Sequence, residues 1–186
     1  MKKGSRILAI TSGPIRRDRK GTALILGVVA RDGLIEGILS ARVATDGTDS
    51  TKRIIGMLSG SRFREQIRLM AINGIALAGL NVVDIDALEK RLGIKAVVVV
   101  RKRPDPKRLI GALKQLERIS GARIGLRVGI VERQAKIKPL LIGGLHFQGK
   151  LDAPDMRKFS GEIYEALRIA HLIVRGVATG ESKGRI

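Results

Sequence analysis

Side chains able to carry out hydrolytic or metal chemistry are few in this chain. It has 17 Asp and Glu residues, two His residues and no Cys among 186 residues. The absence of Cys excludes disulfides, thiolate catalysis and Cys-based zinc sites. His146 and His171 lie too far apart in the sequence for a zinc-binding pattern, and no Ser or Thr has the partners of a hydrolase triad. We expect His146 to be structural or exposed.

Basic side chains dominate the composition and indicate an anionic partner. Lys and Arg number 36, giving a formal net charge of +19 and an isoelectric point near 11.3. A folded domain this basic attracts polyanions. A highly charged thermophilic surface is the alternative, but such surfaces usually balance Lys and Arg with Glu. Nucleic acid is therefore the expected partner, with RNA slightly favoured over DNA and the ribosome as one possible setting.

The basic residues expected to contact phosphate fall into five clusters along the chain. They are Arg16, Arg17, Arg19 and Lys20; Arg101, Lys102 and Arg103; Lys107 and Arg108; Arg123, Arg127 and Arg133; and Lys183 and Arg185. The second cluster follows a predicted strand, at the carboxyl end where α/β folds commonly bind ligands. The third opens a predicted helix, where its charge opposes the helix dipole and an external anion would offset it. Phosphate contacts of this kind set affinity rather than sequence preference.

The same composition argues against a membrane protein. Apolar runs such as 23–30 and 96–100 are far shorter than the roughly 20 residues that a spanning helix needs. Nothing near Met1 has the pattern of a signal peptide, so we expect a cytoplasmic protein. Aromatic residues make up only 2%, which disfavours a reader of single strands that stacks bases on aromatic rings.

Strand and turn patterns predict an antiparallel meander in the first quarter of the chain. Apolar runs at 6–10, 22–30 and 34–44 predict three strands, and Asp32-Gly33 predicts a hairpin between the last two. A helix capped by Thr48 or Asp49 should follow, ending at Ser59-Gly60.

Alternating helices and strands are predicted after the meander. They are a strand at 66–72, a small apolar segment at 73–83, a helix at 84–92 capped by Asp84, a buried parallel strand at 94–100, helices at 106–119 and 122–134, an extended segment at 145–148, a helical stretch from Pro154 and a long helix at 162–179 stopped by Gly180. This order predicts a ribonuclease H-like α/β fold, a mixed sheet flanked by helices. We expect one domain over 1–186, with a basic tail from about residue 181.

Several separate motifs resemble one known family over nearly the whole chain. They are ATDGTDST at 44–51, GIALAGLNVVDID at 74–86, AVVVVRKRPD at 96–105 and LRIAHLIVRGVATGESKGR at 167–185. Together they resemble an archaeal family related to endonuclease V, whose members are described as endonucleases acting on deoxyuridine-containing DNA. The resemblance implies an endonuclease V-like fold and a Mg²⁺-dependent site at the sheet edge.

The first strand departs from that family. Where the family has Asp-Asp-Gly, this chain has Thr11-Ser12-Gly13. The family's acids would hold the Mg²⁺ ions that clamp the scissile phosphate and activate water. Hydroxyl groups are neutral and far weaker ligands, so we expect no bound metal, or a metal held by Asp46 if there is one.

The resemblance also names the remaining candidates for a site. Asp46 and Asp49 match acidic positions after the third strand, Glu181 could approach the same face, and His171 would touch phosphate or water there. The simpler interpretations are helix capping for Asp49, an exposed tail for Glu181 and a packed histidine for His171. Asp84 is expected to cap a helix. Asp86 is expected to be a solvated acid in the first turn of that helix, where it interacts favourably with the helix dipole.

Three classes of function remain open from the sequence. We favour a nucleic-acid-binding, catalytically degenerate relative of the family that needs no cofactor. The first alternative is an active Mg²⁺-dependent endonuclease that uses Asp46, Asp49 and Glu181. The second alternative is a structural protein whose basic faces meet acidic proteins.

Overall fold

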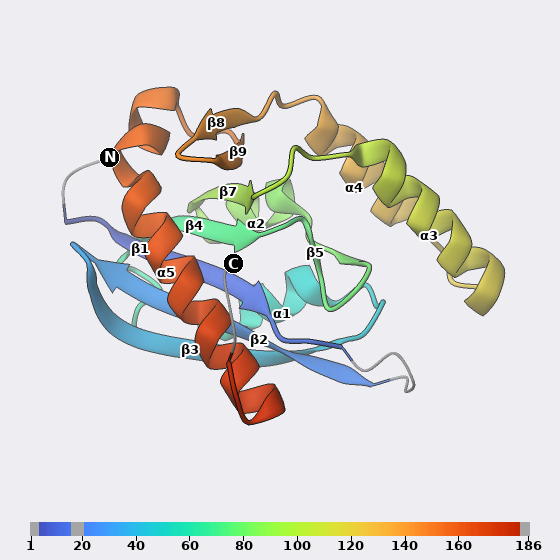
Figure 1. Ribbon diagram of the computed structural model, residues 1–186, viewed down its shortest axis with the longest axis horizontal. Coiled ribbons are helices and arrows are strands. Elements are labelled where there is room, and N and C mark those ends of the chain that lie inside the picture. Colours follow the sequence, from blue (N-terminus) through green and yellow to red (C-terminus); the bar gives the residue numbers. More distant parts are fainter. Residues whose placement is uncertain (1–3, 16–20, 183–186) are drawn as a thin grey trace.

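A seven-stranded mixed sheet forms the centre of the protein, seen in a computed structural model that describes residues 4–15 and 21–182 (Figure 1). The strand order is β3-β2-β1-β4-β7-β9-β8. The strands are β1 (Arg6–Ser12), β2 (Thr22–Arg31), β3 (Leu34–Ala44), β4 (Ile67–Asn73), β7 (Lys95–Val100), β8 (Leu140–Ile142) and β9 (Leu145–Gly149). Only β1, β4 and β7 run parallel to one another, so their carboxyl ends meet at one edge of the sheet.

The meander predicted from the sequence is present at one side of the sheet. β1 pairs antiparallel with β2, and β2 pairs antiparallel with β3. Asp32 and Gly33 both have positive φ, as the tight turn between β2 and β3 requires. After this hairpin and the helix that follows it, the chain enters β4, which pairs parallel with β1.

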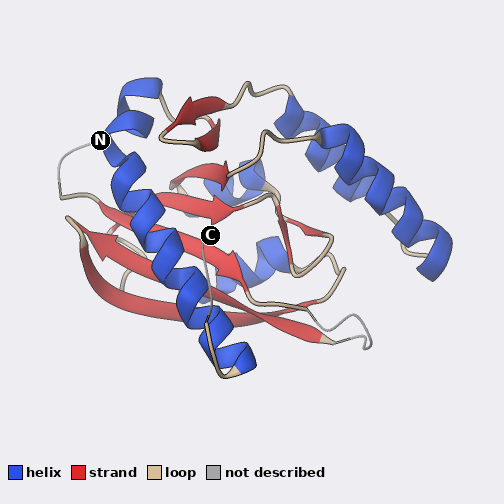
Figure 2. Cartoon of the chain, in the orientation of Figure 1, coloured by secondary structure: helices blue, strands red, loops and turns tan. Residues whose placement is uncertain are grey.

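Two helical layers cover the two faces of the sheet, as Figure 2 shows. The helix α5 (Ala153–Thr179) crosses one face diagonally, over a cluster that includes Ile7 and Ala9 of β1. The helices α1 (Ser50–Ser59) and α2 (Ile85–Leu92) lie on the other face, over Leu8 and Ile10. Because side chains alternate along a strand, these clusters tell which face each neighbouring residue points to.

A helical hairpin projects from the sheet beyond β7. It consists of α3 (Pro106–Ser120) and α4 (Gly125–Ala135), which share a small core around Leu113 and Ile130. Beside it lies a two-stranded ribbon of β5 (Ala76–Leu77) and β6 (Asn81–Val82). The ribbon's turn carries Gly79 with φ of 87°, a conformation that favours glycine.

The elements differ from the sequence prediction at a few points. The segment from Pro154 and the predicted helix at 162–179 form one continuous helix of 27 residues. It begins with Pro154 in its first turn, and Asp152 caps it. The strand β7 is buried and parallel to β4 as predicted, but its other neighbour, β9, is antiparallel. The short strands β5, β6 and β8 were not predicted. Within the described residues, no helix has the length and apolarity needed to cross a membrane.

Candidate functional site at the carboxyl edge of the sheet

A neutral pair of side chains ends the two central parallel strands. Ile7 and Ala9 face α5, so Thr11 of β1 faces α5 as well, and Asn73 of β4 follows Leu69 and Ala71 in the same way. The Asn73 amide donates to the Thr11 hydroxyl, with Nδ2 and Oγ1 3.2 Å apart. Asn73 was missed by the sequence prediction, although a polar residue that ends an apolar strand was the available signal.

The last turns of α5 pass close to the same edge and carry two basic side chains. A Cβ atom placed on Gly13, directly after β1, would lie 3.1 Å from Cγ2 of Val174, so α5 passes close to the end of β1 at this point. His171 lies three residues before Val174 in the helix, and Arg175 directly follows Val174. Burial, and then the charge of Arg175, lower the pKa of His171. Among the described residues, neither Nδ1 of His171 nor Nε of Arg175 has a hydrogen-bond partner, although both atoms are buried.

We call Thr11, Asn73, His171 and Arg175 the edge cluster. Its members come from β1, β4 and α5, three elements that are distant in sequence. The cluster contains two neutral side chains, one histidine and one guanidinium, and no carboxylate.

Asp46 lies near the same edge but on the other side of Thr11, at the turn between β5 and β6. Its main-chain N–H donates to the Ala78 carbonyl at 3.0 Å, and the Ala78 N–H donates to the Ser12 hydroxyl at 3.1 Å. The Leu80 N–H donates to Oδ1 of Asp46 at 2.8 Å. Ser12 and Asp46 thus share Ala78 as a neighbour, so the end of the first strand lies close to Asp46.

Asp49 stabilises the loop before α1, and both of its carboxylate oxygens accept hydrogen bonds from this chain. Its Oδ1 accepts from the main chain of Ala44 at 3.0 Å and from the amide of Asn81 at 2.8 Å, and its Oδ2 accepts from Arg53 at 3.1 Å. Burial would raise the pKa of Asp49, but these hydrogen bonds outweigh it and hold the pKa below its ordinary value. Asp49 is the N-cap residue of α1, as predicted, but its side chain accepts no hydrogen bond from the main chain of the helix.

Arg127 is a buried structural residue, which corrects its predicted place in a surface stripe. It is only 2% exposed, and its guanidinium donates to the carbonyls of Asp46 at 2.8 Å, Leu80 at 3.2 Å and Gly47 at 3.4 Å. Burial lowers the pKa of Arg127. Its helix α4 packs against the loop after β3, and this contact between segments 80 residues apart could not be inferred from local spacing.

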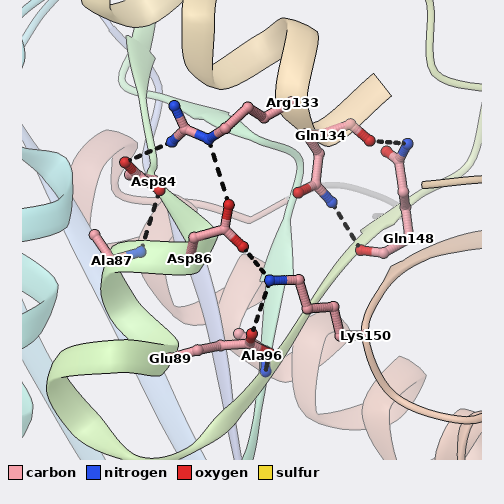
Figure 3. Close-up of polar contacts among 9 residues, drawn as sticks. All are labelled: Asp84, Asp86, Ala87, Glu89, Ala96, Arg133, Gln134, Gln148 and Lys150. Atoms are coloured by element: carbon pink, nitrogen blue, oxygen red, sulfur yellow. Dashed lines mark hydrogen bonds and ion pairs between the residues drawn. The ribbon is translucent and has the colours of Figure 1, made fainter. Parts of the chain in front are cut away.

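Asp84 and Asp86, at the start of α2, connect this helix to Arg133 of α4 and to Lys150 after β9, as Figure 3 shows. Asp84 caps α2 by accepting from the Ala87 N–H at 3.2 Å, as predicted, and its other oxygen lies 2.8 Å from Arg133. Asp86 lies 2.6 Å from Lys150 and 3.4 Å from Arg133. Arg133 is therefore engaged with acids of this chain.

The basic turn after β7 is exposed beside a pocket. Arg101, Lys102 and Arg103 are exposed between β7 and α3. A pocket of about 250 Å³ opens next to them, and Lys102, Gln134 and Gln148 are among its lining residues. The side-chain amides of Gln134 and Gln148 each donate to the main-chain carbonyl of the other residue, as Figure 3 shows.

The remaining predicted contact residues have varied surroundings. Lys107, Arg108 and Arg123 are exposed, but Asp105 already caps α3 by accepting from the Arg108 N–H at 2.9 Å. The carboxylate of Asp105 thus supplies one anionic group at the start of this helix. Glu181 is exposed beyond Gly180, the residue that ends α5. The predicted contacts outside the described residues are Arg16, Arg17, Arg19, Lys20, Lys183 and Arg185.

The donor set of this edge does not fit a divalent metal ion. Mg²⁺ needs charged oxygen ligands, and the ends of β1 and β4 supply a hydroxyl and an amide instead. Within residues 4–15 and 21–182, no three His, Asp or Glu side chains come together as a metal site would require. Asp46 is a single carboxylate, and one of its oxygens is already bonded to the main chain.

Comparison with solved structures defines the class of fold. The chain superposes on human endonuclease V with a TM-score of 0.53 at 11% identity, covering 95% of this chain and 87% of that one. It superposes more closely on a protein of unknown function from Archaeoglobus fulgidus, with a TM-score of 0.80 at 30% identity, covering 92% and 97% of the two chains. The predicted ribonuclease H-like α/β fold is confirmed.

Sequence comparison then gives the family. The family model of endonuclease dU matches residues 3–178. A UPF0215 protein from Methanothermobacter thermautotrophicus is 38% identical over 185 residues, which cover 96% of this chain and 90% of the relative. The chain belongs to the endonuclease dU family, as the sequence motifs indicated.

Proposed function

We propose that this protein binds nucleic acid through the carboxyl edge of its sheet and does not cut it. The observation that carries the proposal is the Thr11–Asn73 pair, which puts two neutral side chains at the ends of the central parallel strands. A metal-dependent nuclease needs carboxylates there to hold the ions that stabilise the attacking and leaving oxygens. Membership in an endonuclease family and the net charge of +19 support the nucleic-acid partner.

The exposed basic turn supplies the contacts to the phosphate backbone. Lys102 and Arg103 stand at the end of β7, on the same edge of the sheet as Thr11 and Asn73. Ligands of α/β folds bind outside the carboxyl ends of the strands. Structured RNA is the favoured partner, because so large a surplus of positive charge suits a protein within an RNA assembly, such as a ribosomal one.

A salt series tests the binding. Affinity for a labelled RNA hairpin and for a DNA duplex of matched length should fall with salt at a log–log slope of about −0.7 to −0.9 per phosphate contacted. The double variant Lys102→Gln/Arg103→Gln should flatten that slope. The matched control is Lys90→Gln/Arg91→Gln in the last turn of α2, which precedes β7 and lies at the opposite edge. No binding to either probe at low salt would contradict the proposal.

A nicking assay tests the absence of cleavage. The unmodified sequence should leave deoxyuridine-, deoxyinosine- and RNA-containing substrates intact with Mg²⁺ or Mn²⁺. The second candidate, an active endonuclease, draws on the Asp46 carboxylate beside Ser12. Metal-dependent nicking that disappears in Asp46→Ala would promote that candidate to first place.

A further inference from the structure

The edge cluster has the opposite charge from a metal-binding nuclease site. Carboxylates in such a site hold cations, and the cations hold the phosphate. Here Thr11 and Asn73 are neutral, and the turn of α5 that passes close to the end of β1 carries the guanidinium of Arg175. With no acid to neutralise, a cation at this position would be repelled, while a phosphate would be attracted directly.

Arg175 is not neutralised by the described part of its own chain. No Asp or Glu among the described residues forms an ion pair with Arg175 or with His171. Arg168 on the same helix differs, because it forms an ion pair with Glu165 at 2.6 Å. A partly buried guanidinium without a carboxylate partner is stabilised when an anion completes its hydrogen bonds.

We propose that the edge cluster binds one phosphate directly, in the place where a metal-dependent relative would bind it through metal ions. This inference rests on the proposed function in one respect, namely that the phosphate belongs to a nucleic-acid backbone. Arg175 supplies a planar, permanently charged fork that matches two phosphate oxygens, and an imidazole N–H of His171 donates beside it. Asn73 gives one amide hydrogen to Thr11 and keeps the second for the anion.

The origin of the donors favours a phosphate over a carboxylate ligand. They come from the ends of two strands and from two successive turns of a helix, so they do not belong to one element. A tetrahedral anion presents oxygens in several directions, whereas a carboxylate presents two in one plane. The exposed turn with Lys102 and Arg103 continues the basic surface for the neighbouring phosphates of a chain.

The two histidines allow a direct test with inorganic phosphate. His146 follows Leu145 and precedes Phe147, both of which face α5, so His146 faces the other side of the sheet, where it pairs with Val100 beside the basic turn. In a ¹H–¹⁵N spectrum of the imidazoles, added phosphate should shift the His171 signals more strongly than those of His146, which reports phosphate at the basic turn. Equal shifts of both histidines, or none, would overturn the proposal.

Matched variants connect the spectral change to the cluster. Arg175→Gln should weaken the phosphate-dependent shift of His171, and Arg168→Gln, which removes the same charge from the same helix, should leave it unchanged. If both variants behave alike, the effect is general electrostatics and the cluster is not a site. A one-to-one addition of Mn²⁺ should not broaden the His171 signals, and selective broadening would instead identify a metal site and overturn the proposal.

A nucleic-acid titration separates this inference from the proposed function. Arg175→Gln should lower the magnitude of the log–log salt slope for an RNA hairpin by about 0.7 to 0.9, the share of one phosphate, while Arg168→Gln keeps the parent slope. If the hairpin binds and Arg175→Gln keeps the parent slope, the inference fails and the proposed function stands. If no nucleic acid binds but phosphate still shifts His171 selectively, the proposed function fails and the anion site stands.

Discussion

Replacing Arg127 by Met should destabilise the fold without touching a nucleic-acid contact. The guanidinium is 2% exposed and donates to the carbonyls of Asp46 and Leu80 at 2.8 and 3.2 Å, with a longer contact to Gly47 at 3.4 Å. Methionine fills a similar volume but donates nothing, so these buried carbonyls would lose their partner. Two hydrogen bonds to a charged donor at about 1.5 kcal/mol each give a loss of about 3 kcal/mol.

Urea or thermal unfolding measures this loss. For a domain of this size, about 3 kcal/mol corresponds to a fall of about 6–12 °C in Tm. Arg123→Met is the matched control, because Arg123 is an exposed arginine of the same hairpin and its substitution should change stability by no more than about 0.5 kcal/mol. A variant Arg127→Met of parental stability that binds RNA more weakly would refute the reasoning and return Arg127 to the binding surface.

Three further predictions follow from the same edge of the sheet. Gly79→Ala should lower stability by about 1–3 kcal/mol in urea unfolding, because φ is 87° and a Cβ atom would collide with the carboxylate of Asp46; a neutral effect would show that the turn adapts freely. Burial, followed by a neighbouring positive charge, depresses the pKa of His171 from 6.5, so its contribution to stability is complete above about pH 6.5 and is lost as the pH falls below that value. Between about pH 7 and about pH 5, His171→Gln should therefore lose less stability than the parent, and identical pH profiles would contradict the depressed pKa. The double variant Thr11→Asp/Asn73→Asp should gain Mn²⁺ binding by calorimetry and lose affinity for nucleic acid, and a parent chain that already binds Mn²⁺ equally well would contradict the charge argument.

Local patterns predicted most of the elements because local chemistry determines them. The Asp32-Gly33 pair fixes a hairpin by its backbone conformation, and Asp84 begins a helix by capping it. The helical stretch from Pro154 and the helix predicted at 162–179 form one helix, because apolar contacts with the sheet continue along α5 through that region.

The site was less predictable, because it depends on contacts between distant segments. Arg123 and Arg127 look alike in the sequence, four residues apart in the helix predicted at 122–134. In the structure, Arg123 is exposed before α4, and Arg127 lies buried under the loop after β3. Asn73 gained its place only from the register of β4 beside β1, which aligns it with Thr11. His171 was singled out by family resemblance, and its function at the edge stays a prediction.

The hydrogen bonds that hold the loop after β3 have a consequence for how such a chain can change over evolutionary time. Asn81, Asp49 and Arg127 hold this loop through main-chain carbonyls and N–H groups. Many metal enzymes depend on the ion itself for the shape of the site, so that loss of a ligand also loosens the fold. Because side chains of this chain hold the loop, we expect substitutions at the strand ends to alter what the edge binds while the loop keeps its shape.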